Sequence, residues 1–171
     1  MIKRNLIKRV MAAGAIMAVT LSLAGCGIGG SSVKLGAAGV GGGYYAFTNA
    51  FAQIASSEDE DLDFEVKVTA GSTANIRLLS DGYVDMAIAQ ADLVDAAYNG
   101  TGATDKKRYR GYSAVASLYT EACQIVVRAD SGIDNLDDLQ GKKISVGEEE
   151  SGTQRNAEQI LQMTGLVESL V

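Results

Sequence analysis

Short apolar runs alternate with amphipathic segments along most of this 171-residue chain, and this alternation constrains the fold more than any other feature. Three runs have the length and composition of strands: residues 33–38, the alternating set Phe64, Val66 and Val68, and residues 84–89. Each run leads through a polar turn into a segment with helical spacing. Chains of this pattern fold as α/β domains with largely parallel strands. We therefore predict an α/β fold.

Apolar spacing places the other expected elements along the chain. One helix is predicted to begin near Tyr44, and a second contains Ile76 and Leu79 and ends near Gly82. Two short helices are predicted over residues 93–98 and 135–140. A last helix contains Ala157, Ile160 and Leu161. Further strands are predicted at residues 112–119, 123–127 and 142–146.

The first 26 residues have the layout of an export signal. Four basic residues (Lys3, Arg4, Lys8 and Arg9) precede an uncharged run, residues 10–23, that is too short for a convincing membrane span. The run leads into Leu-Ala-Gly-Cys, which resembles the lipobox of bacterial lipoproteins. We therefore predict a signal peptide over residues 1–25, lipidation of Cys26, a flexible tether over residues 26–32, and an extracytoplasmic protein anchored to the membrane by lipid. The alternative is an ordinary secretory signal with an incidental cysteine.

Composition excludes several classes of function. The chain has 15 basic and 21 acidic residues, so removal of the four basic signal residues leaves 11 against 21 and a net charge of −10. Such an acidic body argues against nucleic-acid partners. The chain has no histidine, which excludes Ser-His-Asp, Cys-His and histidine-ligated metal chemistry. Cys123 is the only cysteine besides Cys26, so no internal disulfide framework is expected.

Three turns rich in glycine, serine and threonine each lead from a predicted strand into a predicted helix, at residues 39–45, 69–75 and 147–156. Helix N-termini carry unpaired N–H groups and partial positive charge, so a convergence of several would make an anion site. Each turn alone could be a capped helix start, with Ser72 and Ser151 as plausible N-caps. The glycine run also fits a weak dinucleotide-binding pattern. The second strand, however, ends without the carboxylate that such a site requires.

Eight short motifs follow one another in this part of the chain. They are Gly-Gly-Gly-Tyr-Tyr (41–45), Thr-Ala-Gly-Ser-Thr-Ala-Asn (69–75), Ala-Gln-Ala-Asp (89–92), Ser-Leu-Tyr-Thr-Glu (117–121), Val-Arg-Ala-Asp-Ser-Gly-Ile (127–133), Leu-Gln-Gly-Lys-Lys (139–143), Val-Gly (146–147) and Ser-Gly-Thr (151–153). The ordered set resembles the TAXI family, the extracytoplasmic solute receptors of TRAP transporters, over about residues 33–165.

The resemblance implies a periplasmic-binding-protein fold of type II, in which two α/β lobes close on a small solute. Residues 33–121 would form the first lobe and residues 122–171 the beginning of an incomplete second lobe. The implied solute is a small organic anion or amino acid, such as a dicarboxylate or glutamate, and no cofactor or enzymatic activity is implied. The implied partner is the membrane permease of a TRAP transporter, driven by an ion gradient. The implied ligand-binding residues are Tyr44, Tyr45, Ser72, Asn75, Gln90 and Tyr119 from the first lobe, and Ser151, Gly152 and Thr153 from the second.

The sequence departs from the family pattern at two places. Three consecutive glutamates, residues 148–150, precede Ser-Gly-Thr, where the family has small or mixed residues. If one of these carboxylates points inward, an amino acid suits the site better than a dianion. Family members also continue well beyond residue 171, so we expect this sequence to be the N-terminal part of a receptor. A surface lipoprotein with an adhesive or structural role is the alternative, and solute-induced stabilisation would separate the two functions.

Overall fold

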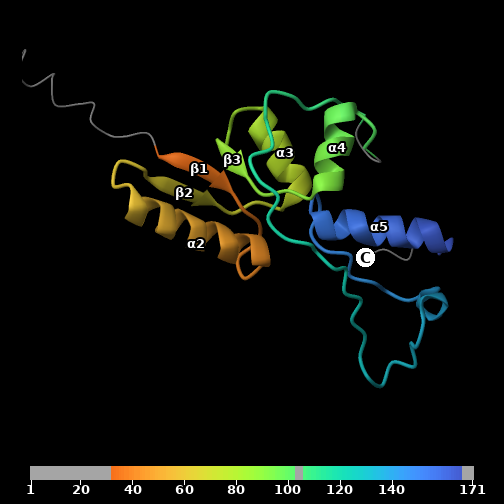
Figure 1. The fold of residues 1–171 in the computed structure, drawn as a ribbon. Coiled ribbons are helices and arrows are strands. Elements are labelled where there is room, and N and C mark those ends of the chain that lie inside the picture. Colours follow the sequence, from red (N-terminus) through yellow and green to blue (C-terminus); the bar gives the residue numbers. More distant parts are fainter. Residues whose placement is uncertain (1–31, 103–105, 167–171) are drawn as a thin grey trace, which may run out of the picture. The chain divides into compact units, whose positions relative to one another are not determined.

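Three parallel strands form the sheet of the computed structural model, which describes residues 32–102 and 106–166 (Figure 1). Strand β1 (Val33–Gly36) lies between β2 (Phe64–Lys67) and β3 (Met86–Ala87). Leu35 of β1 stands opposite Val66 of β2 and Met86 of β3. The predicted α/β class with parallel strands is therefore confirmed, although each strand is shorter than its apolar run.

Four α-helices and one short 3₁₀ helix accompany the sheet. They are α2 (Gly43–Glu58), α3 (Ser72–Ser80), α4 (Ala91–Asn99), the 3₁₀ helix η1 (Leu136–Leu139) and α5 (Gly152–Thr164). The chain runs β1–α2–β2–α3–β3–α4. The first connection leads from β1 to β2 on one side, and the second leads from β2 across to β3 on the other side of β1. Ligands of open α/β sheets bind at such a reversal, beyond the carboxyl ends of the strands.

The core lies where β1 meets α3. Leu35 and Ala37 at the end of β1, Ala74 and Ile76 of α3, and Val84 before β3 are all buried. Helix α2 contributes less to this core, and its aromatic face packs on its neighbours instead. Phe51 meets Phe64 of β2 edge to face, with ring centroids 5.7 Å apart.

Local sequence explains how the later helices begin. Ser151 is the N-cap of α5, as predicted, and its hydroxyl accepts a hydrogen bond from the Gln154 N–H at 3.0 Å. Asn135 and Asp138 form a capping box around η1. Ser72 differs from its prediction, because Gly71 occupies the N-cap position of α3 and Ser72 is the first helical residue. Gly71 has a φ of 122°, a conformation that favours glycine.

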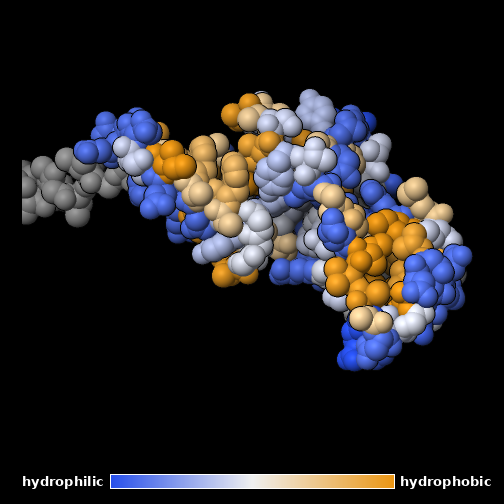
Figure 2. Space-filling model, turned by 60° about the horizontal axis from the view of Figure 1, so that its bottom comes forward, coloured by the Kyte–Doolittle hydropathy of each residue, from blue (hydrophilic) through white to orange (hydrophobic). Residues whose placement is uncertain are grey.

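Three predicted strands do not form among the described residues. Residues 112–119 and 123–127 run without regular secondary structure, and residues 142–146 contain only an isolated bridge at Ile144. No backbone hydrogen bond joins residues 112–127 to another described residue. Their apolar side chains are exposed, Val115 by 85% and Val126 by 87%, and apolar side chains gather over this part of the molecule in Figure 2. Cys123, inside this stretch, is a free and exposed cysteine.

We expect the 171-residue chain to self-associate through this exposed stretch, because unpaired backbone and exposed apolar side chains together form a template for strand pairing. The double variant Val115→Lys, Val126→Lys should shift the chain toward monomer in analytical ultracentrifugation. Val40→Lys is the matched control, because Val40 is also exposed, by 74%, but lies in the turn before α2. A wild-type chain that stays monomeric, or a control that restores monomer equally well, would contradict this expectation.

The predicted signal peptide, the lipidation at Cys26 and almost all of the tether lie outside the described residues. Among the residues that the structure describes, no helix combines the length and the apolar character needed to cross a bilayer.

Candidate functional site

A pocket of about 300 Å³ lies where three helices begin. Its wall includes the starts of α2, α3 and α5 and the stretch that follows the predicted first lobe. The lining residues are Ala38, Gly42, Gly43, Tyr44, Ala70, Gly71, Ser72, Gln90, Glu121, Ala122, Cys123, Gln124, Ser151, Gly152, Thr153 and Asn156. Six of the nine predicted ligand-binding residues are in this set, and Tyr45, Asn75 and Tyr119 are not.

The start of α5 is in close contact with Ser72 and Gln90. A Cβ atom placed on Gly152 would stand 1.9 Å from Gln90 Oε1 and 2.9 Å from Ser72 Oγ. Ser72 is almost fully buried, and its hydroxyl accepts a hydrogen bond from the backbone N–H of Gln90 at 3.2 Å. Residues far apart in the sequence therefore meet here, and a side chain at position 152 would displace Gln90 or Ser72.

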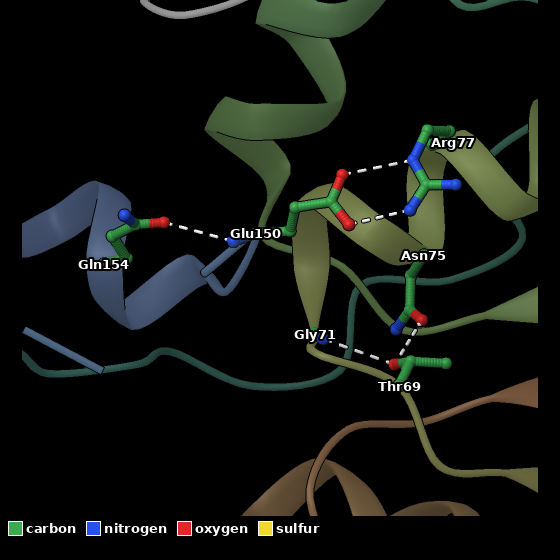
Figure 3. Close-up of polar contacts among 6 residues, drawn as sticks. All are labelled: Thr69, Gly71, Asn75, Arg77, Glu150 and Gln154. Carbon is green, nitrogen blue, oxygen red and sulfur yellow. Dashed lines mark hydrogen bonds and ion pairs between the residues drawn. The ribbon is translucent and has the colours of Figure 1, made fainter. Parts of the chain in front are cut away.

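The turn before α5 is held on α3 by main-chain and side-chain contacts. The N–H groups of Thr73 and Ala74 donate to the carbonyl of Glu150 at 3.1 and 3.3 Å. Arg77 donates from Nε and Nη2 to the two carboxylate oxygens of Glu150, at 3.1 and 2.7 Å (Figure 3). This pairing raises the pKa of Arg77 above its usual value. Both side chains are partly exposed, so the ion pair contributes about 1 kcal/mol at most.

The acidic triplet does not face the pocket. None of residues 148–150 lines it, and the Glu150 carboxylate is directed to Arg77 of α3 (Figure 3). Glu150 also takes a positive φ of 63°, and its N–H donates to Gln154 Oε1 at 3.1 Å. The expectation that one of these three carboxylates would select the solute is therefore unsupported by their positions.

Asn75 is fully buried and joins the ends of two strands to the turn before α3. Its Nδ2 donates to the carbonyls of Ala37 at 2.6 Å and Ile88 at 2.8 Å, and its Oδ1 accepts from the Thr69 hydroxyl at 2.7 Å (Figure 3). Gly36 allows this approach, because a Cβ there would stand 2.9 Å from Asn75 Oδ1. The amide of Asn75 is thus hydrogen-bonded to protein groups, and Asn75 does not line the pocket. Its position is that of a residue that supports the pocket wall.

Tyr44 is hydrogen-bonded to Glu121, the charged residue of the pocket wall. Its hydroxyl donates to Glu121 Oε2 at 2.8 Å, although the two residues are 77 positions apart. Burial, and to a lesser extent the neighbouring Glu121 carboxylate, raises the pKa of the Tyr44 hydroxyl well above its usual value. Tyr44 therefore stays protonated at neutral pH and acts as a hydrogen-bond donor to Glu121.

The two remaining aromatic candidates lie away from the lining. Tyr119 is about half exposed, and its ring packs on Phe47 of α2 with centroids 6.2 Å apart. Tyr45 is half-buried within α2, where its carbonyl accepts a hydrogen bond from the side chain of Asn49. Sequence reasoning included Glu121 in the motif at residues 117–121 but did not place it in the site. Gln124 and Asn156 line the pocket without any motif that would mark them.

A larger pocket of about 580 Å³ lies among α3, α4 and α5 and contains none of the nine predicted residues. Its two arginines are already paired with its own carboxylates, Arg77 with Glu150 and Arg155 with Glu158. In the part of the chain that the structure describes, no lysine or arginine lines the smaller pocket. Among the described residues, no three acidic or cysteine side chains are grouped as a metal site.

The sequence matches the NMT1-like family over residues 35–171, which includes β2, β3, the second half of β1, every described helix and every residue of the pocket wall. This family fits the periplasmic type of solute-binding protein, and such proteins are generally extracytoplasmic. The match extends over most of the chain, and the parallel sheet agrees with it. The chain therefore belongs to the NMT1-like family of solute-binding receptors.

Proposed function

We propose that this protein is the solute receptor of a TRAP transporter, of the TAXI type, and that it captures a small carboxylate-bearing solute such as a dicarboxylate or an acidic amino acid. The permease would be driven by an ion gradient, and acyl chains on Cys26 would keep the receptor at the membrane surface. The observation that carries the proposal is the pocket of about 300 Å³ at which α2, α3 and α5 begin.

The donors around this pocket suit a carboxylate. The N–H groups of Gly152 and Thr153 have no hydrogen-bond partner among the described residues. They belong to the first turn of α5, whose partial positive charge favours an anion. Neutral donors of this kind can bind a carboxylate through charge-assisted hydrogen bonds of roughly 1.5–3 kcal/mol each. A volume near the lower end of the range for ligand pockets suits a small solute.

The proposed lobes agree with the composition of the pocket wall. Residues up to Glu121 would belong to the first lobe and residues from Ala122 to the second, and the wall draws on both sets. A solute bound between them would favour the closed form, which would then dock on the permease. We assign Asn75 to the support of the pocket. The other eight residues stay proposed ligand-binding residues: Tyr44, Tyr45, Ser72, Gln90, Tyr119, Ser151, Gly152 and Thr153.

A thermal-shift screen of the intact protein tests this function. Small dicarboxylates and acidic amino acids should stabilise it, by about 2.7 kcal/mol at 100 times the dissociation constant, and sugars should not. Ser72→Ala should weaken the shift, because it removes a buried hydroxyl from the pocket wall and leaves the Gln90 N–H without its acceptor. Ser57→Ala, at the exposed end of α2, is the matched control. Stabilisation by sugars with no response to carboxylates would contradict the proposal.

A further inference from the structure

The pocket wall contains acceptors as well as donors. Glu121 is the only charged side chain in the lining, and no lysine or arginine of the wall neutralises it. Among the residues that the structure describes, its one side-chain hydrogen bond is the one it accepts from the Tyr44 hydroxyl on Oε2. A carboxylate with two oxygens can accept about four hydrogen bonds, so Glu121 keeps acceptor capacity for a bound molecule.

Gln90 supplies a second acceptor. Its Oε1 atom is buried and has no hydrogen-bond partner among the described residues. The atom lies beside the start of α5, at 1.9 Å from the position that a Cβ on Gly152 would take. A buried acceptor without a partner is unfavourable, so a ligand that supplies a donor here is favoured.

A purely anionic solute would be disfavoured by these two acceptors. The helix starts attract one carboxylate, but a second negative charge in the same 300 Å³ would meet Glu121 with no cation in the lining to offset it. An ammonium group, by contrast, has three N–H donors and a positive charge. Glu121 and Gln90 line the same pocket, and such a group offers donors to both of them.

We propose that Glu121 and Gln90 form an ammonium subsite, and that the solute of this protein is an α-amino acid and not a carboxylic acid without an amine. The inference rests on the proposed function and narrows its solute class. The carboxylate of the amino acid would lie at the N–H groups of Gly152 and Thr153, and its ammonium group at Glu121 and Gln90. Tyr44 orients the Glu121 carboxylate by its hydrogen bond.

Calorimetric titration of the intact protein with matched ligand pairs tests the subsite. The pairs are L-glutamate with glutarate, L-alanine with propionate, and L-leucine with 4-methylpentanoate, which differ within each pair only by the amine. In the pair whose side chain fits the pocket best, we expect the amino acid to bind at least tenfold more tightly than the acid without the amine. Glu121→Gln keeps an acceptor for Tyr44 but removes the charge, so it should abolish that preference and leave the affinity for the acid without the amine unchanged or higher.

Glu148→Gln is the matched control, because it removes the same charge from an exposed glutamate that does not line the pocket. It should keep the preference for the amino acid. Equal binding of both members of every pair, or a preference that survives Glu121→Gln, would overturn the ammonium subsite while leaving a carboxylate receptor intact. If no member of any pair binds, the proposed function itself fails and the subsite with it.

Discussion

Replacing Gly152 by valine is expected to lower solute affinity about 5- to 150-fold, the equivalent of about 1–3 kcal/mol of overpacking. A Cβ at this position would stand 1.9 Å from Gln90 Oε1, 2.6 Å from Gln90 Cδ and 2.9 Å from Ser72 Oγ. The Gln90 side chain can rotate away, but Ser72 is almost fully buried at the start of α3, and its hydroxyl is hydrogen-bonded to the Gln90 N–H. Helix α5 would therefore have to move away from the other half of the pocket.

Gly39→Val is the matched control for this change. A Cβ on Gly39 would have only Glu148 Oε2 within 4 Å, at 3.9 Å, and Gly39 lacks the positive φ that would make a side chain costly. Titration calorimetry of both variants measures the effect, and their thermal unfolding shows that they remain folded. Wild-type affinity in Gly152→Val, or an equal loss in Gly39→Val, would show that the close approach of α5 is not required for binding.

Asn75→Ala is expected to lower the free energy of unfolding by about 2–4 kcal/mol, the largest stability effect that we anticipate for a polar side chain. The change leaves the carbonyls of Ala37 and Ile88 and the hydroxyl of Thr69 without the partner that now joins them. These groups lie in the interior at the ends of the strands, where unpaired polar atoms are costly.

Denaturant unfolding of the intact protein measures this effect. Asn49→Ala is the control, because Asn49 is exposed on α2 and donates only to the carbonyl of Tyr45. We expect that control to change stability by about 0.5 kcal/mol or less. Affinity of the folded Asn75→Ala protein for its solute should fall less than that of Ser72→Ala, because Ser72 lines the pocket and Asn75 does not. Equal stability of the two asparagine variants would contradict the supporting role of Asn75.

The part of the fold that sequence predicts well is local. The alternation of Phe64 and Val66 predicted β2. The spacing of Ile76 and Leu79 predicted a helix and they lie in α3, and the spacing of Ile160 and Leu161 predicted the helix α5 that contains them. Ser151 has the chemistry of an N-cap and occupies that position. Each of these features depends on residues within a few positions of one another, which a single sequence contains.

The predictions that are wrong depended on distant partners. Residues 112–119 and 123–127 have the apolar composition of strands, but composition does not supply a neighbouring strand. In the structure their backbone groups have no partner among the described residues. Ser72 differed for a similar reason, because Gly71, with its positive φ, took the N-cap position and the Ser72 hydroxyl bonds to Gln90 instead.

The site was predictable as a convergence of turns but not in its details. Tyr44, Ser72 and Gly152 belong to three turns that sequence marked, and all three line one pocket. Glu121 was not assigned, because its approach to Tyr44 spans 77 positions and leaves no local pattern. The role of Asn75 had one usable signal. Gly36 lies inside the strand predicted at residues 33–38, where glycine often indicates a close approach by another group.

The most direct test of the central claim is to identify the small molecule that the protein carries when it is purified without added ligand. Intact wild-type protein and Gly152→Val would be isolated in parallel by native purification, denatured, and the released molecules identified by mass spectrometry. We predict that the wild type releases a small solute with a carboxylate group and that the variant releases much less of it. A wild type that releases a solute without a carboxylate, or equal release from both proteins, would contradict a carboxylate-binding pocket at the start of α5.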